Sequence, residues 1–227
     1  MNDIKTNDLF LSGPSPAVLI VMAAGEEETS EKDHITNLLS SSLNSDYALL
    51  VFQVKDWNKD LSPWEAPPVF GKESFGCGAE HTLSGILRYI DDSCAAVPYL
   101  NDIDIPIILC GYSLAGLFAL WSAYQTERFS RIAAVSPSVW FPGWAEYTAS
   151  HSVHTRCVYL SLGDKEAKTR NPVMATVRDR IESCYASLSS ENGTKTILEY
   201  NPGNHFQDAP GRLTKGILWT AHTILGE

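Results

Sequence analysis

The sequence has few basic residues relative to its acidic ones. It contains 17 Lys and Arg against 27 Asp and Glu among 227 residues, which gives a formal net charge of −10. Nucleic acids and anionic membrane surfaces bind positively charged faces, so this balance argues against both as partners. No basic segment followed by an apolar stretch opens the chain, so no secretory signal is predicted. The apolar run at residues 17–24 is far shorter than the roughly 20 residues of a membrane-spanning helix. We therefore expect a cytoplasmic protein.

Cysteines are also few and scattered. The chain has five, an odd number, and no Cys-x-x-Cys pair. This pattern predicts reduced packing thiols and not a disulfide framework. His151 and His154 have a spacing that could hold a metal ion on a helix, but no carboxylate pattern accompanies them. No metal ion and no cofactor is predicted, and the sequence does not indicate an oligomeric state.

Neither internal repeats nor a low-complexity linker divide the chain. With 44% apolar and 19% charged residues, it can bury a substantial core. This length fits the usual size of one domain. We expect a single domain over residues 1–227.

Short apolar runs alternate with segments of helical periodicity. The predicted strands lie at 17–24, 47–54, 106–110, 132–135, 157–162 and 196–200. The predicted helices lie at 29–43, 79–90, 114–124, 173–188 and 213–225. Most of the strands are continuously apolar, as expected where both faces of a parallel sheet are covered by helices. The fold class is therefore α/β with a mostly parallel central sheet, to which residues 8–11 could add a strand.

Residues 55–78 fit neither period and are rich in aromatic residues, proline and glycine. A loop of this length in a compact domain is usually functional or disordered, and its aromatic content argues against disorder. Two interpretations stay open, a packed loop and a minimal lid over a pocket.

The segment around Ser113 carries the strongest chemical signal. A buried strand leads into Gly111-Tyr-Ser113-Leu-Ala115-Gly116, and an apolar helix follows directly. This order predicts a nucleophile elbow, a strained turn that needs small neighbours; here Ala115 occupies the position of the usual second glycine. The N-terminus of the following helix favours a developing oxyanion, so the Leu114 N–H is a candidate donor.

A serine nucleophile needs a base. After a nucleophile elbow, the usual order along the chain is serine, then acid, then histidine base. His205 lies in a loop after the last predicted strand, where the base is expected. The preceding strand ends in Gly163-Asp164-Lys-Glu166, which offers two carboxylates. We prefer Glu166 as the acid because it lies three residues after Gly163, which is a common position for the acid in this architecture. Asp164, directly after the glycine, remains the alternative. The acid would fix the imidazole tautomer and stabilise the imidazolium.

The loop after the first long strand usually supplies a second oxyanion donor. Position favours the N–H of Glu26, with Gly25 as the alternative. The pocket should lie at the carboxyl ends of the strands. Its expected substrate-binding residues are the aromatic side chains that follow strands or lie in the long loop, namely Tyr112, Trp57, Trp64, Phe75 and Trp140.

Four segments together resemble the α/β-hydrolase superfamily, and within it the esterases that include esterase D and the enterobactin-type siderophore esterases. They are residues 111–116, 136–140, 161–166 and the Gly-Asn-His-Phe at 203–206. The resemblance spans residues 17–225 and implies Ser113 as nucleophile and His205 as base. The chain departs from the family at Ala115, and it is short and lacks a large cap domain. The siderophore substrates are therefore not carried over.

These observations predict an enzyme, a serine hydrolase that cleaves a carboxylic ester of a small molecule through an acyl-enzyme. Thioesterase, peptidase or acyltransferase activity on the same residues remains open. A non-catalytic binding protein on a hydrolase scaffold is the alternative from another class.

Overall fold

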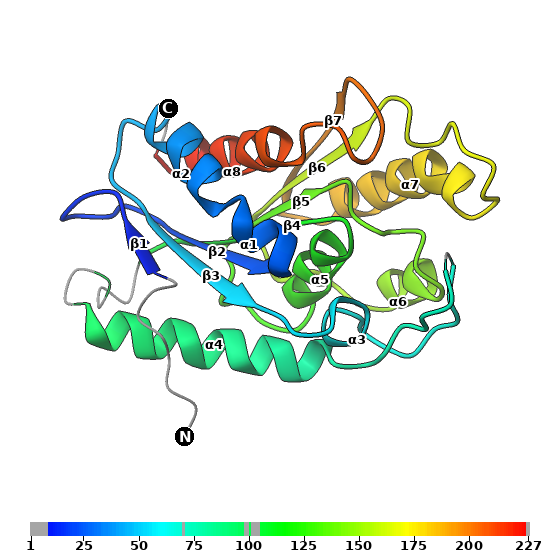
Figure 1. The fold of residues 1–227 in the computed structure, drawn as a ribbon, viewed down its shortest axis with the longest axis horizontal. Helices are drawn as coiled ribbons and strands as arrows, with labels where there is room; N and C mark the ends of the chain where they lie inside the picture. Colours follow the sequence, from blue (N-terminus) through cyan, green and yellow to red (C-terminus); the bar gives the residue numbers. More distant parts are fainter. Residues whose placement is uncertain (1–8, 70, 98–99, 101–104, 226–227) are drawn as a thin grey trace.

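The chain forms a seven-stranded sheet with helices on both faces (Figure 1). The computed structural model describes residues 9–69, 71–97, 100 and 105–225. The strands are β1 (Leu9–Leu11), β2 (Leu19–Ala24), β3 (Ala48–Gln53), β4 (Ile107–Tyr112), β5 (Arg131–Val135), β6 (Cys157–Gly163) and β7 (Lys195–Asn201). Their order across the sheet is β1-β3-β2-β4-β5-β6-β7, with β1 antiparallel to β3 and every other pairing parallel.

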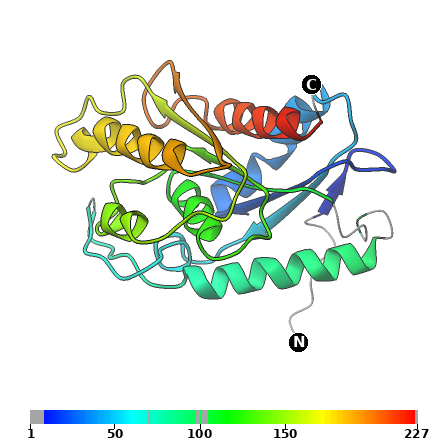
Figure 2. The same cartoon turned by 180° about the vertical axis from the view of Figure 1, so that it is seen from behind.

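The helices are α1 (Glu26–Ser30), α2 (Lys32–Ser40), α3 (Trp57–Asp60), α4 (Ala79–Ala96), α5 (Leu114–Ala123), α6 (Trp144–Ala149), the short 3-10 helix η3 (Met174–Thr176), α7 (Val177–Ser190) and α8 (Ala209–Leu225). Apolar side chains of α2 and α8 pack on one face of the sheet, and those of α4, α5 and α7 pack on the other (Figures 1 and 2). Strands β2 to β6 are almost entirely buried, which explains their continuous apolar sequences.

The predicted α/β class and the mostly parallel sheet are confirmed, and residues 9–11 supply the extra edge strand. The single helix predicted over residues 29–43 is wrong, since α1 ends at Ser30 and α2 begins at Lys32. The backbone N–H and side-chain hydroxyl of Thr29 both donate to the Gly25 carbonyl, at 3.0 and 2.6 Å. Both bonds lie within the first turn of α1, and α2 begins as a separate helix at Lys32.

The long loop at residues 55–78 is partly ordered into regular structure. Asp56 caps α3 by accepting a hydrogen bond from the Lys59 N–H at 3.1 Å. Farther along, Ala66 and Phe75 exchange backbone hydrogen bonds in an isolated β-bridge. The described parts of the loop are therefore held at these two points. Its α3 end faces the carboxyl edge of the sheet, where β4, β6 and β7 end and the site residues follow.

Candidate active site

Ser113 occupies a strained turn between β4 and α5. Its φ is 58° and its ψ is −119°, a conformation that non-glycine residues rarely adopt. The Ser113 carbonyl accepts from the Leu117 N–H at 3.1 Å, so the helix begins at once after the turn. Such strain is characteristic of a nucleophile elbow, which lifts the serine hydroxyl away from the backbone.

The glycines of the elbow are required by close backbone approaches. A Cβ on Gly111 would lie 2.3 Å from the Ala115 carbonyl oxygen, and one on Gly116 would lie 3.1 Å from the Gly111 oxygen. The second tight position is therefore Gly116, and Ala115 is accommodated in the core at 1% exposure. This explains how alanine can stand where the usual motif has glycine.

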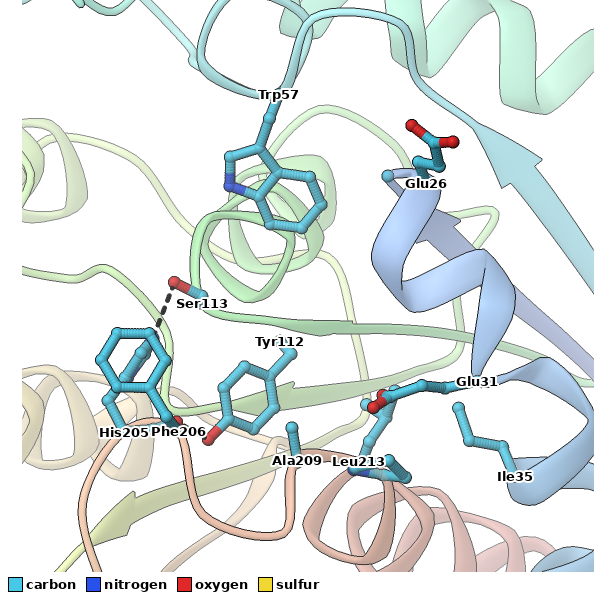
Figure 3. A pocket seen from close by; sticks show the side chains of 12 residues that line it. Glu26, Glu31, Ile35, Trp57, Tyr112, Ser113, His205, Phe206, Ala209 and Leu213 are labelled. Carbon is cyan, nitrogen blue, oxygen red and sulfur yellow. Dashed lines mark hydrogen bonds between the residues drawn. The ribbon is translucent and has the colours of Figure 1, made fainter.

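His205 lies in the loop between β7 and α8 and contacts both candidate partners. Its Nε2 is 3.0 Å from Ser113 Oγ, and its Nδ1 is 2.8 Å from Glu166 Oε2 (Figure 3 shows the serine contact). The Tyr112 hydroxyl donates to the His205 carbonyl at 2.6 Å. Burial raises the pKa of Tyr112, so this phenol stays protonated and keeps donating. The imidazole is thus fixed at its backbone and at both ring nitrogens.

The Glu166 carboxylate is buried, with 2% of its side chain exposed, and is saturated with donors. Its Oε1 accepts from the Gly163 N–H at 2.6 Å, the Ser136 hydroxyl at 2.7 Å and Arg212 Nη2 at 2.8 Å. Burial alone would raise the pKa of Glu166, but the hydrogen bonds from its neighbours, His205 first, outweigh burial and lower it to about 2. The carboxylate is therefore ionised at any ordinary pH.

Asp164, the other carboxylate of the segment, has a different role. It is exposed, and its Oδ1 accepts from the Gly203 N–H at 2.8 Å. That bond ties the β6 loop to the loop that carries His205. Of the two acids left open by the sequence, Glu166 is the one that contacts the imidazole.

The two segments expected to hold an oxyanion border the same cavity, the elbow through Ser113 and the start of α1 through Gly25 and Glu26. Leu114 is the first residue of α5, where N–H groups have no partner one turn earlier in the helix. Gly25 and Glu26, at the start of α1, line a cavity of about 500 Å³ together with Ser113. Glu26 and Gly25 remain alternatives as the second donor.

Two cavities meet at the Ser113–His205 pair. The larger one is lined on one side by Trp57 and on the other by Tyr112 and Leu213 (Figure 3). The smaller one, of about 290 Å³, is lined by Trp140, Met174, Lys165, Lys168 and Thr169 among others. Ser113, His205 and Phe206 border both.

Two of the predicted pocket residues lie outside both cavities. Trp57, Tyr112 and Trp140 line one of the two cavities, but Trp64 and Phe75 line neither. The Trp64 indole N–H donates to the Pro142 carbonyl at 2.7 Å, and its ring packs on Phe141 and Tyr147. Phe75 is 5% exposed and packs on Trp140 and Phe141, so it supports the pocket wall from behind. Trp64 and Phe75 of the long loop are thus packed against other aromatic side chains, while Trp57 at its start lines the larger cavity.

Sequence reasoning missed three residues of the site. Arg212 and Ser136 hold Glu166, and Phe206 stands beside His205 with its side chain 89% exposed. Phe206 follows His205 directly, so its place at the site could have been inferred from the sequence. Arg212 lies on α8 and gave no signal, because only the folded chain brings it to the acid.

In the described part of the chain, no three His, Cys, Asp or Glu side chains gather closely enough to hold a metal ion. The described cysteines are all free thiols. No described helix is long and apolar enough to span a membrane.

No family model and no curated protein matches this sequence. Solved structures do. The siderophore hydrolase EstA from Aspergillus nidulans shares 18% identity with a TM-score of 0.69, over 93% of this chain and 85% of its own. An IroE-like serine hydrolase from Shewanella oneidensis shares 19% identity with a TM-score of 0.73, over 93% of this chain and 74% of its own.

The enterobactin esterase FES from Shigella flexneri shares 17% identity with a TM-score of 0.64. The match covers 95% of this chain but only 55% of that one. At these identities the likeness shows the fold alone. The chain has the α/β-hydrolase fold.

Proposed function

We propose that this protein is a serine hydrolase that cleaves carboxylic esters of small molecules through an acyl-enzyme. One observation carries the proposal: the His205 imidazole bridges Ser113 Oγ, at 3.0 Å, and the buried Glu166 carboxylate, at 2.8 Å. A serine is a poor nucleophile without a base, and a base needs an orienting acid. Ser113 would be the nucleophile, His205 the base and Glu166 the acid.

The chemistry follows from which atoms hold protons. Glu166 is ionised and accepts a hydrogen bond from the Nδ1–H of His205, so Nε2 carries no proton and is the base that faces Ser113. Nε2 removes the hydroxyl proton as Oγ attacks the ester carbonyl, and the imidazolium then protonates the departing alcohol oxygen. Water repeats the sequence on the acyl-enzyme and releases the carboxylic acid.

The tetrahedral oxyanion would be held by the Leu114 N–H and by the N–H of Glu26 or Gly25. A preorganised donor of this kind contributes about 2.7 to 4 kcal/mol to the transition state. The start of α5 adds the positive end of its helix dipole at the same point.

The two cavities support a small ester whose halves lie on either side of the serine. Volumes of about 500 and 290 Å³ fit groups of small-molecule size. Several structural neighbours are esterases or hydrolases by name, two of them siderophore hydrolases. We adopt the ester bond from this likeness and leave the siderophore aside, because the elements formed by the described residues include no separate domain over the site.

The test is hydrolysis of p-nitrophenyl acetate and labelling by a fluorophosphonate probe. Wild-type protein should turn over the ester and be labelled, and Ser113→Ala should lose both. Ser189→Ala, on the exposed surface of α7, serves as the matched control and should retain both. A wild-type chain that is not labelled would instead be a binding protein on this scaffold. Thioester and amide analogues in the same assay separate esterase from thioesterase and peptidase activity.

A further inference from the structure

Arg212 is a buried cation on the far side of the proposed acid. It lies in the first turn of α8, and only 3% of its side chain is exposed. Its Nη2 donates to Glu166 Oε1 at 2.8 Å and also to the Ser136 hydroxyl. Its Nη1 donates to the Asn204 carbonyl at 3.2 Å. A simple triad of serine, histidine and acid does not require this residue.

The contacts of Arg212 join the separate loops of the site. Glu166 follows β6, Ser136 follows β5, and Asn204 directly precedes His205. The guanidinium also lies over the ring of Tyr112, 5.4 Å from its centroid, and Tyr112 belongs to the elbow strand. One planar, multiply donating group therefore fixes the acid relative to the base, a task for which Arg is better suited than Lys.

The charge of Arg212 matters as much as its hydrogen bonds. One carboxylate oxygen of Glu166 binds the guanidinium and the other binds the imidazole. Guanidinium and imidazole thus share a single negative charge in a buried site. When His205 takes up a proton, the imidazolium is attracted by Glu166 but repelled by Arg212. An imidazolium is therefore less stable beside a carboxylate that is shared with Arg212 than beside one that is not shared.

Other charged groups lie near the pair, and two of them, Lys165 and Lys168, line the smaller cavity together with His205 and Glu166. Asp208 precedes α8, and Asp164, Lys165 and Lys168 lie on the exposed segment after β6. Glu26 and Glu31 border the larger cavity from α1 and the turn after it. Tyr112 faces His205 as a neutral phenol. Of the described ion pairs, Arg212 and His205 are the partners of Glu166.

We propose that Arg212 is a positioning residue that holds the Glu166 carboxylate toward His205 and shares the charge of that carboxylate with the imidazole. This inference rests on the proposed function. It assigns to α8 a part in catalysis although Arg212 lines neither of the two cavities.

Two substitutions separate position from charge. Arg212→Lys keeps the charge and loses the planar fork, so kcat should fall roughly 10- to 100-fold while the acid limb of the kcat/KM–pH profile stays in place. Arg212→Gln keeps a donor and loses the charge, so the midpoint of the acid limb should move up by about one pH unit. Ser136→Ala removes an uncharged donor from the same oxygen and should lower kcat without moving the midpoint.

The profiles are measured with p-nitrophenyl acetate from about pH 4 to pH 9 on protein whose fold is checked by circular dichroism. An unmoved acid limb in Arg212→Gln overturns the role of charge, and an unchanged kcat in Arg212→Lys overturns the role of position. If neither variant folds, Arg212 is a structural residue and the proposal fails. If wild-type protein neither hydrolyses the ester nor reacts with the fluorophosphonate, the proposed function itself fails.

Discussion

Replacing Glu166 by Gln tests the arrangement of the site most sharply, because the structure dictates how the amide must sit. Three donors converge on Oε1: the Gly163 N–H, the Ser136 hydroxyl and Arg212 Nη2. Only the amide oxygen can accept from all of them. The amide NH2 must therefore occupy the Oε2 position, 2.8 Å from His205 Nδ1.

The consequence is a reversed imidazole tautomer. An NH2 facing Nδ1 requires Nδ1 to accept, so the ring proton moves to Nε2 and faces Ser113. His205 then cannot remove the serine proton. A wrong tautomer of this kind lowers kcat by about 10⁴, which is about 5.5 kcal/mol of transition-state stabilisation. We expect KM to change less than kcat, because Gln keeps the size of the side chain where Glu166 borders the smaller cavity.

The assay must separate lost chemistry from lost folding. Glu166→Gln leaves Arg212 as an unpaired buried charge, which destabilises a protein by about 3 to 5 kcal/mol. Rates are therefore measured under conditions where circular dichroism shows a folded chain. Asp164→Asn is the matched control, since that carboxylate bonds only the Gly203 N–H among described groups and should cost less than tenfold. Activity above a tenth of wild type in Glu166→Gln, or a larger loss in Asp164→Asn, would refute the reasoning.

Three further predictions concern stability and binding. The pKa of Glu166 is about 2 in the folded protein and 4.5 ordinarily, so its ionised form stabilises the fold above pH 4.5 and this stabilisation is lost toward pH 2. In urea titrations the free energy of unfolding should therefore fall by about 3 kcal/mol between pH 5 and pH 2. An equal fall in Glu166→Gln would contradict this. Gly111→Ala places a Cβ 2.3 Å from the Ala115 oxygen and should prevent labelling by fluorophosphonate, whereas normal labelling would show that the elbow can relax. Phe206→Ala should raise KM about tenfold for aromatic or long-chain esters and have little effect on the acetate ester. A large substrate would cover this exposed ring, and burying it contributes about 1.5 kcal/mol. Equal effects on both kinds of ester would exclude a binding role.

The elbow could be predicted from the sequence because all of its determinants are local. A buried strand, a serine between small residues and an apolar helix follow one another within residues 107–123. Their geometry is set by backbone approaches between neighbours, such as that of Gly111 to Ala115. The sheet could be predicted for a related reason, since burial on both faces leaves continuous apolar runs.

The choice between Asp164 and Glu166 could not be made from the sequence. Both follow the same glycine in a turn, and only the direction of each side chain separates them. Asp164 turns toward the Gly203 N–H, and Glu166 turns inward beneath His205. Those directions depend on where the loop after β7 lies, which is a tertiary property.

The same limit applies to the aromatic residues of the long loop. Composition indicated that Trp57, Trp64 and Phe75 pack against something, but it carried no information on which side. The structure turns Trp57 into the cavity and Phe75 into the core, because the β-bridge between Ala66 and Phe75 folds that part of the loop back on itself.

Arg212 shows why a site can be complete only when the last helix docks. His205 lies between β7 and α8, and both sides of its loop are tied down by α8 or by the elbow. The Asn204 carbonyl accepts from Arg212, and the His205 carbonyl accepts from Tyr112. Together with His205, which has the larger effect, the hydrogen bond from Arg212 opposes the effect of burial and lowers the pKa of Glu166. The docking of α8 therefore adds one of the contacts that keep the acid ionised and facing its base.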